Sequence, residues 1–363
     1  MQIRIIRDRA ELASLAPGWV ALAAHGRPFQ EFGWCQAWLN TIGSTGGRRP
    51  HIVAAWQDNQ LMGILPLVAR RYKGVRLLEW IGARATDYCD AIVADDVEVD
   101  VTLQAMWRHL CDAGGFDVWR MGQVRMDARV RPLLARLAPW IETREQAFSI
   151  PLRWTDTESW LKAQSPKSRA RVRRGVRRMS ELGLTLRVWK PGEALEPVLE
   201  QVIQQKQRWI AHRQADSFLI QPHGPQFLRE LAGRLAQSGS LHLSCLQSGD
   251  GTIVATHFGF FRDGVFYYYL PTYDADYAAQ RVGTLLLDSL VRWCCDQGAS
   301  RFDMLLGAHQ YKSSYGVEAE EVQTLVHGRG LLGKAAVKFY RATRRRASGN
   351  SDGGPALTES DNR

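Results

Sequence analysis

The sequence predicts a mixed α/β protein built from two similar halves with largely antiparallel sheets. A chain of 363 residues with 45% hydrophobic residues is long enough for two cores of ordinary size. Short apolar runs of strand length alternate with segments of helical periodicity in both halves. In the second half, four strands precede one helix and one further strand, and this order restricts the choice of fold.

The first half, residues 1–150, is predicted to combine strands with a few helices. Strands are expected at residues 3–7, 51–57, 61–70 and 76–81, and helices near residues 101–111 and 130–137. Asp58-Asn59-Gln60 has the composition of a hairpin turn between the second and third strands. Large rings at helical spacing are more typical of a core than of a ligand site, so we expect a buried aromatic cluster. Its members are Phe29, Phe32, Trp34 and Trp38.

A domain boundary is predicted near residues 150–155. An apolar strand at residues 147–152 ends there in polar residues, and a strongly basic helix follows. Ser165 suits the N-cap of this helix, Pro166 its first position and Gly183 the residue after its end. One face is apolar and consists of Val172, Val176, Met179 and Leu182. The other faces carry cations, namely Lys167, Arg169, Arg171, Arg173, Arg174, Arg177 and Arg178.

The second half, residues 151–330, is predicted to continue with a strand at 185–188 and helices at 195–210 and 225–237. Strands follow at 241–246, 253–261 and 265–270, then a helix at 282–296, a strand at 301–306, a short helix and a strand at 321–327. No short-period repeat is visible, but each half contains a strand, a helical region and a hairpin, which hints at duplication. Residues 331–363 are expected to form a basic helix over 334–346 and a disordered tail.

Composition limits the environment and the partners of the protein. The first residues break their apolar runs with charge and later apolar stretches have strand length, so we expect no signal peptide, no transmembrane segment and a cytoplasmic location. The six cysteines form no CxxC pair and are expected to be reduced. The net charge of +10 favours an anionic partner, for which nucleotide cofactors, tRNA and lipid head groups all qualify.

Two segments near the end of the second half carry a family resemblance. Residues 302–307 read Phe-Asp-Met-Leu-Leu-Gly, and residues 311–316 read Tyr-Lys-Ser-Ser-Tyr-Gly. With the preceding strands, they resemble the GNAT domain of CelD-like acyltransferases, which are related to Fem-type peptidyltransferases. The resemblance covers the chain up to about residue 330. It implies tandem GNAT-like domains facing one cleft, and an N- or O-acyltransferase whose acceptor is a cell-envelope sugar or polysaccharide precursor.

The resemblance also implies a sheet that splays between two strands, with acyl-CoA as the donor and no metal. The pyrophosphate of the donor would lie at the N-terminus of the helix at 282–296, where free amides and the helix dipole favour an anion. Gln280 and Gly283 match the glycine motif of the family, whereas Leu285 departs from it. The donor-binding candidates are Gln280, Arg281, Gly283 and Thr284, and the alternative for Gly283 is a simple turn or packing glycine.

The candidates for catalysis lie in the same half. The resemblance places Lys312 in the donor or acceptor cleft, where it would stabilise negative charge, with Tyr311 as a proton donor or substrate contact. His257 could be the general base or a buried core histidine. Asp303 interrupts an apolar strand, so it is expected to assist the base or to be structural. No Ser/His/Asp or Cys/His pattern indicates an acyl-enzyme, which favours direct attack on the donor in a ternary complex.

Two loops are candidates for acceptor binding. Asp87, Tyr88 and Asp90 follow a glycine turn in the first half, and two carboxylates beside a ring could hold an amino or hydroxyl acceptor. An ordinary loop stabilised by Asx turns is the alternative. Tyr273 and Asp274, which precede the glycine motif, are further candidates for substrate contacts.

A second class of function stays open. The arginine-rich helix over residues 167–178 could bind tRNA or another nucleic acid. The protein would then be an aminoacyl-tRNA-dependent transferase of the Fem type or a nucleic-acid-binding protein. No helix-turn-helix or zinc motif accompanies the helix, which argues against sequence-specific DNA binding. A charged helix with an apolar docking face is also typical of a solvated surface.

Overall fold

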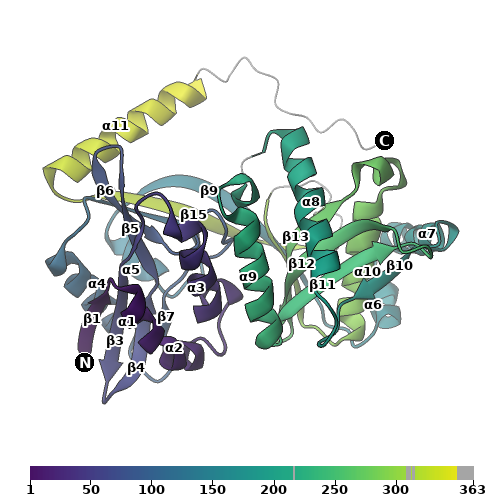
Figure 1. Ribbon diagram of the computed structural model, residues 1–363, viewed down its shortest axis with the longest axis horizontal. Helices are drawn as coiled ribbons and strands as arrows, with labels where there is room; N and C mark the ends of the chain where they lie inside the picture. Colours follow the sequence, from purple (N-terminus) through teal and green to yellow (C-terminus); the bar gives the residue numbers. More distant parts are fainter. Residues whose placement is uncertain (216, 308–311, 313–314, 350–363) are drawn as a thin grey trace.

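The structure is a computed structural model, and it describes residues 1–215, 217–307, 312 and 315–349. These residues form a four-stranded and an eleven-stranded sheet covered by helices (Figure 1), which confirms the predicted mixed α/β fold class. Among them, no helix combines the length and the apolar character needed to cross a bilayer.

The first half starts with strand β1 (Gln2–Ile6) and the helical segments α1 (Arg9–Ser14), α2 (Ala16–Leu22), η1 (Pro28–Gln30), α3 (Phe32–Asn40) and η2 (Ile42–Ser44). The strands β2 (Arg49–Pro50), β3 (Ile52–Gln57), β4 (Gln60–Leu65), β5 (Leu67–Tyr72), β6 (Val75–Trp80) and β7 (Ile92–Val93) follow. The half closes with α4 (Val99–Ala113), β8 (Val118–Arg125), α5 (Arg131–Arg136) and β9 (Trp140–Pro151).

Some details of the first half differ from the prediction. The strand predicted at residues 61–70 is two strands in different sheets, because Pro66 has no amide for a ladder and lies between β4 and β5. The hairpin turn is Asp58-Asn59, whose φ angles are 50° and 63°, and Gln57 pairs with Gln60 as in a two-residue turn. Strand β8 and the first half of β9 had no counterpart among the predicted strands.

The second half contains α6 (Thr157–Ala163), α7 (Pro166–Glu181), β10 (Thr185–Val188), α8 (Glu196–Arg213), η3 (Phe218–Ile220) and α9 (Gly224–Gln237). Next come β11 (Leu241–Gln247), β12 (Ile253–Arg262), β13 (Val265–Tyr273), η4 (Ala275–Gln280), α10 (Val282–Asp296), β14 (Arg301–Leu306), β15 (Glu318–Gly328) and α11 (Gly330–Gly349). Strands β10 to β13 are antiparallel, and β14 returns through α10 parallel to β13, in the predicted order. Helix α11 includes residues 347–349, which were expected in the tail, and residues 350–363 lie outside the described part.

The eleven-stranded sheet runs through both halves in the order β10-β11-β12-β13-β14-β9-β15-β8-β6-β5-β2. Near the centre of this sheet, the two halves exchange strands. Strand β9 pairs with β14 of the second half, whereas β15 pairs with β8 of the first half, and β9 and β15 pair with each other. These strands bond across the halves and leave no free edge between them, so the two predicted halves share one sheet. The division at residue 150 remains a proposal.

Helices cover both faces of the sheet in the second half (Figure 1). Helices α8 and α9 pack on one face, and α6, α7 and α10 pack on the other. The expected aromatic cluster is buried, and it belongs to the core under α8 and α9. The Phe29 ring lies 5.8 Å from that of Phe260, and the Trp34 ring lies 5.5 Å from that of Tyr269, so the cluster joins the first half to the meander.

Helix α7 begins and ends as predicted, but its docked face is narrower than expected. Val172 and Met179 are buried, whereas Val176 is 44% exposed. Gly175 faces α10 instead, and a Cβ at this position would lie 3.5 Å from a methyl carbon of Leu285. The basic helix therefore crosses α10 closely, in the first turns of α10.

Candidate active site

The sheet opens between β13 and β14. In the described chain, the two strands pair only as far as Tyr267 and Asp303, after which β13 continues to Tyr273 and β14 to Leu306. Leu305 has a φ of 57°, a left-handed conformation that turns the end of β14 out of the ladder. Ligands of α/β proteins commonly bind where the carboxyl ends of neighbouring parallel strands separate. This opening is our candidate active site.

A loop of the first half, residues 82–91, enters the opening. The Tyr269 hydroxyl of β13 donates a hydrogen bond to the carbonyl oxygen of Ala85 at 2.5 Å. The carboxylate of Asp87 lies near the backbone amide of Leu306, at the end of β14, and this amide lowers the pKa of Asp87. The loop is therefore bonded to β13 and lies beside the end of β14, at the point where the two strands part.

Asp87 is the titratable group at the centre of the opening. The residue as a whole is partly exposed to solvent, although its carboxyl group is surrounded by protein atoms. Burial raises its pKa from 3.8 to about 7, against the opposing effects of the Leu306 amide and the Lys312 ammonium. The nearby carboxylates of Asp303 and Glu145 raise it further. A carboxyl with such a pKa can exchange a proton at neutral pH.

Lys312 lies beside Asp87 but has a different role from the predicted one. It is 2% exposed, and its Nζ donates to the carbonyl oxygens of Met304, Leu305 and Leu306 at 3.0, 3.3 and 3.0 Å. An ammonium has three protons, so these bonds use all its donors. Burial lowers the pKa of Lys312 to about 8. Lys312 was predicted to stabilise the charge of the substrate directly. We correct this role to a positioning one, because the side chain holds the end of β14.

Lys206 of α8 also faces the opening, and no sequence pattern singled it out. Its Nζ donates to the carbonyl oxygen of Pro271 on β13 at 3.3 Å and lies 4.3 Å from the centre of the Trp209 ring. Burial lowers the pKa of Lys206 to about 8, and attraction to Asp87 opposes the shift. Within the described residues no second acceptor for this ammonium is recorded, so it can donate to a ligand.

Asp303 and Tyr88 form a buried contact between the halves. The Tyr88 hydroxyl donates to Asp303 Oδ1 at 2.7 Å, and the amide of Leu305 donates to the same oxygen at 2.8 Å. Burial raises the pKa of both groups. Tyr88 is therefore unsuited to the predicted contact with an acceptor, because its ring is buried and its hydroxyl is engaged. Asp303 fits the structural alternative.

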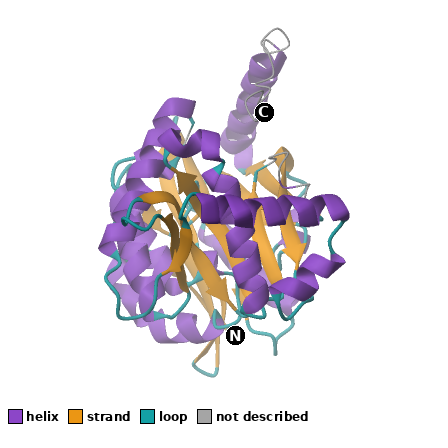
Figure 2. Cartoon of the chain, turned by 90° about the vertical axis from the view of Figure 1, so that its right-hand side faces the viewer, coloured by secondary structure: helices purple, strands orange, loops and turns teal. Residues whose placement is uncertain are grey.

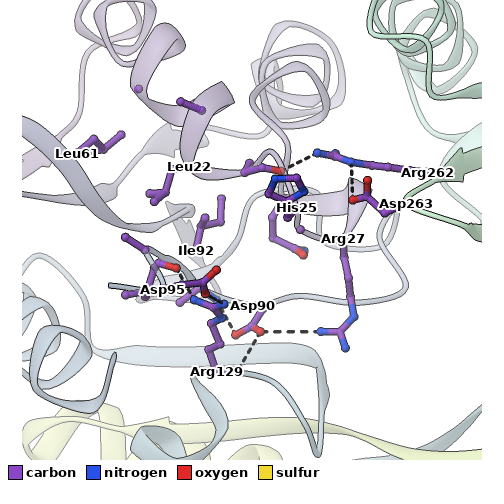
Figure 3. Close-up of a pocket in the computed structure, with 18 of the residues that line it drawn as sticks. Leu22, His25, Arg27, Leu61, Asp90, Ile92, Asp95, Arg129, Arg262 and Asp263 are labelled. Carbon is purple, nitrogen blue, oxygen red and sulfur yellow. Dashed lines mark hydrogen bonds and ion pairs between the residues drawn. The ribbon is translucent and has the colours of Figure 1, made fainter. Parts of the chain in front are cut away.

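Asp90 does not join Asp87. Its carboxylate accepts from the amides of Ala91, Arg129 and Val130 at 2.7, 2.8 and 3.0 Å. Figure 3 shows it turned towards Arg129 and Arg27, in a separate cavity. The two carboxylates of the predicted pair therefore have different partners, and Asp87 is the one that stays a proposed acceptor contact.

That cavity has a volume of about 650 Å³ and lies between α2, β7 and the turn from β12 to β13. Its charged groups form ion pairs with one another (Figure 3). Arg129 pairs with Asp95, and Arg27 lies 2.8 Å from Asp127. The basic groups are neutralised within the wall, which distinguishes this cavity from the opening at Asp87.

His257 is not available as a base. It is fully buried on the face of the sheet covered by α10, whereas Asp87 contacts the sheet on the side of Tyr269 and α8. Its ring stacks on that of Tyr268 at 5.0 Å, and Nδ1 lies 3.3 Å from Nδ1 of His242. Burial holds its pKa well below the ordinary value. The alternative of a core histidine describes it correctly.

The predicted donor-binding residues lie at the N-terminus of α10, which follows β13 through the short helix η4. This helix has no acidic residue in its first turn and no side-chain cap. Arg281 and Thr284 are exposed, and Gln280 Oε1 is buried without a hydrogen-bond partner among the described residues. Gly283 packs against Tyr273, because an added Cβ would lie 3.0 Å from that ring. The backbone amides at the start of α10 suit an anionic group.

Two other predicted residues have simpler positions. The Asp274 carboxylate caps η4 by accepting from the amide of Asp276 at 3.2 Å, a local turn contact. Tyr311 lies outside the described residues.

A charged cluster that sequence reasoning missed fixes α7 and the segment after Lys312 to α10. Arg171 donates to Asp288 Oδ1 at 2.6 Å and to the Tyr315 hydroxyl at 2.5 Å, and Tyr315 donates to the same carboxylate at 2.6 Å. The Arg171 guanidinium also lies 4.0 Å from the centre of the Tyr315 ring. This arrangement leaves Arg171 unavailable to a nucleic acid, although it belongs to the predicted basic surface.

Comparisons with known proteins concern the domain family and the fold. Residues 166–313 match the family model described as Acetyltransferase (GNAT) domain. No curated protein matches the chain.

Several solved structures share the fold. The crystal structure of FemX is 11% identical, covers 89% of this chain and 97% of its own, and has a TM-score of 0.60. The C-terminal domain of a putative lysylphosphatidylglycerol synthetase from Agrobacterium fabrum is 13% identical, with coverages of 92% and 96% and a TM-score of 0.57. L-PGS from Bacillus licheniformis is 14% identical, with coverages of 87% and 96% and a TM-score of 0.55. At these identities the likeness concerns the fold alone.

Proposed function

We propose that this protein, an acyltransferase of the GNAT type, moves an acyl group from acyl-CoA to an amine or hydroxyl acceptor in the opening between β13 and β14. The observation that carries the proposal is the Asp87 carboxyl, which is partly exposed there and has a pKa raised to about 7. Such a group can take the proton of an attacking amine or hydroxyl at neutral pH.

In this mechanism the acceptor attacks the donor directly. Acyl-CoA supplies an activated thioester carbonyl. Asp87 removes the proton from the acceptor nitrogen or oxygen as it bonds to the carbonyl carbon, and the carbon–sulfur bond breaks. The proton passes from Asp87 to the leaving thiolate, so the carboxyl returns to its starting state. Lys206 donates to the carbonyl oxygen as negative charge develops, and Lys312 keeps the end of β14 in place.

The donor is assigned to the N-terminal turn of α10. The amides of this turn, the exposed Arg281 and the lack of an acidic side chain in the first turn favour a pyrophosphate. Gln280 Oε1, which is buried without a protein partner in the described part of the chain, is an acceptor that a bound donor could satisfy. Residues 151–330 would thus form the donor domain, and residues 1–150 would supply the acceptor loop.

We infer the chemical class of the acceptor from the charged side chains in the opening. Asp87 and Lys206 present one acid–base group and one cation, a pair that suits hydroxyl or amino groups on a polar framework. We propose a sugar or polysaccharide precursor of the cell envelope, made in the cytoplasm, as the family resemblance implies.

A second candidate is transfer from an aminoacyl-tRNA. It is favoured by the exposed cations of α7, Lys167, Arg173 and Arg174, on a helix that crosses α10 within its first turns. These cations could contact phosphates beyond the donor site. FemX and lysylphosphatidylglycerol synthetases share the fold, as described above.

The experiment measures release of free thiol from acetyl-CoA and longer acyl-CoAs, with panels of amino sugars and sugar alcohols as acceptors. The wild type should release thiol with at least one acceptor class, and Asp87→Asn should be slower by about 10²- to 10⁴-fold. Glu145→Gln is the matched control, because this exposed carboxylate affects Asp87 only through its charge.

Calorimetric titration with CoA and a salt series of tRNA binding separate the two donors. Binding of CoA supports the main proposal. Salt-sensitive tRNA binding without CoA binding, lost in an Arg173→Glu/Arg174→Glu variant, would replace it by the second candidate.

A further inference from the structure

Helix α11 projects from the body of the molecule (Figures 1 and 2). One of its faces is fixed to the sheet. The Tyr340 hydroxyl donates to Glu142 at 2.6 Å, and its ring meets that of Trp140 edge to face at 5.8 Å. Gly333 touches the backbone of the first half so closely that a Cβ would lie 1.9 Å from the carbonyl oxygen of Asp117. These contacts set the rotation of the helix about its axis.

The opposite face of α11 is apolar and exposed. Leu331 is 91% exposed, Phe339 72% and Leu332 58%. At 100° per residue, Leu331, Ala335, Phe339 and Ala342 fall on one stripe, and all four are exposed. The stripe therefore follows the helical period and is turned away from the core, so packing against the described residues does not account for it.

Cations border the stripe. Lys334, Lys338 and Arg341 are exposed and lie on the neighbouring helical positions along one side. The sequence has no Asp or Glu between residues 330 and 349, and it adds Arg344, Arg345 and Arg346 at the end of the helix. An apolar stripe bordered by lysine and arginine is the pattern of a helix that lies in the plane of a membrane interface.

We propose that α11 docks on the surface of an anionic lipid bilayer. Leu331, Leu332 and Phe339 enter the boundary between head groups and acyl chains, while Lys334 and Lys338 reach anionic head groups with their long side chains. The charge of the helix is complementary to such a surface. A nucleic acid would engage the cations but would leave the apolar stripe in water. This inference is independent of the chemistry proposed at Asp87.

The test is flotation of the full chain with vesicles of phosphatidylglycerol and phosphatidylcholine, and with vesicles of phosphatidylcholine alone. We expect the wild type to float with the anionic vesicles at low salt. The double variant Leu331→Glu/Phe339→Glu should bind more than about tenfold more weakly, because two large apolar side chains are lost from the stripe. Val101→Glu is the matched control, since Val101 is 59% exposed on α4, and it should bind as the wild type does.

A second pair of variants separates the contribution of apolar insertion to vesicle binding from the contribution of charge. Phe339→Leu should retain binding, whereas Lys334→Glu/Lys338→Glu should remove the preference for anionic vesicles. Thermal unfolding checks that each variant is folded, and all these substitutions are at exposed positions.

Three results would overturn the proposal. The first is a wild type that does not float with anionic vesicles. The second is flotation that the Leu331→Glu/Phe339→Glu variant retains. The third is a wild-type dimer without vesicle binding that this variant converts to a monomer, because the stripe would then cover a second copy of the chain.

Discussion

Replacing Asp87 by Asn tests the raised pKa and the proposed base together. The amide oxygen of Asn is an acceptor of similar size, so it can stay beside the Leu306 amide. The substitution removes the titration and the negative charge that attracts Lys206 and Lys312. It should therefore slow acyl transfer and at the same time change how stability depends on pH.

The magnitude follows from linkage. The unfolded carboxyl releases its proton near 3.8, and the folded one near 7, so the folded protein holds an extra proton between these values. Stability then falls as pH rises through this window and stays lower above it. Between pH 5 and pH 7 this amounts to at most about 3 kcal/mol, and solvent at the partly exposed group reduces it to about 1 to 3 kcal/mol.

The assay is thermal or urea unfolding of wild type and Asp87→Asn from pH 5 to pH 9, paired with single-turnover transfer. The variant should gain about 1 to 3 kcal/mol relative to the wild type between pH 5 and pH 8. It should lose about 10²- to 10⁴-fold in rate. Wild-type turnover should rise through about pH 7 as Asp87 ionises and fall above about pH 8 as Lys206 loses its proton. Parallel stability curves, or an undiminished rate, would refute the reasoning.

Three further substitutions test neighbouring parts of the site. Lys312→Met removes one donor from each of three carbonyl oxygens, so it should lower both the rate and the free energy of unfolding, the latter by about 1 to 3 kcal/mol in urea titrations. Gly283→Val would press on the Tyr273 ring and should weaken CoA binding in calorimetry, and unchanged affinity in a folded variant would move the donor elsewhere. Tyr88→Phe removes a donor from buried Asp303 and should cost about 1 to 3 kcal/mol of stability, whereas no loss would show that this contact is dispensable.

Much of the second half could be predicted because its signals are local. The N-cap at Ser165, the glycine at Gly183 and the apolar periods of β10, α10 and β14 fix these elements within a few residues. The exchange of β9 and β15 could not be predicted in this way. Strand pairing depends on residues more than a hundred positions apart, and the period of a single strand does not identify its partner.

The candidate site shows the same limit. Asp87 stood out because a carboxylate beside a ring on a loop is chemically conspicuous, but Lys206 resembles any lysine of an amphipathic helix until the fold brings it near. His257 stayed open between a general base and a core histidine, because alternation along β12 does not tell which face of the sheet opens. Lys312 was found through the family resemblance, yet its role depends on three backbone carbonyls that only the bend at Leu305 brings together.

Hydrogen–deuterium exchange with and without CoA tests most directly whether the donor binds where β13 and β14 separate. We expect slower exchange in residues 274–286, at the start of α10, and in the loop at residues 82–91. We expect no change around Arg27 and Arg129, which line the separate cavity. Protection confined to that cavity, or no protection at the start of α10, would contradict this placement of the donor.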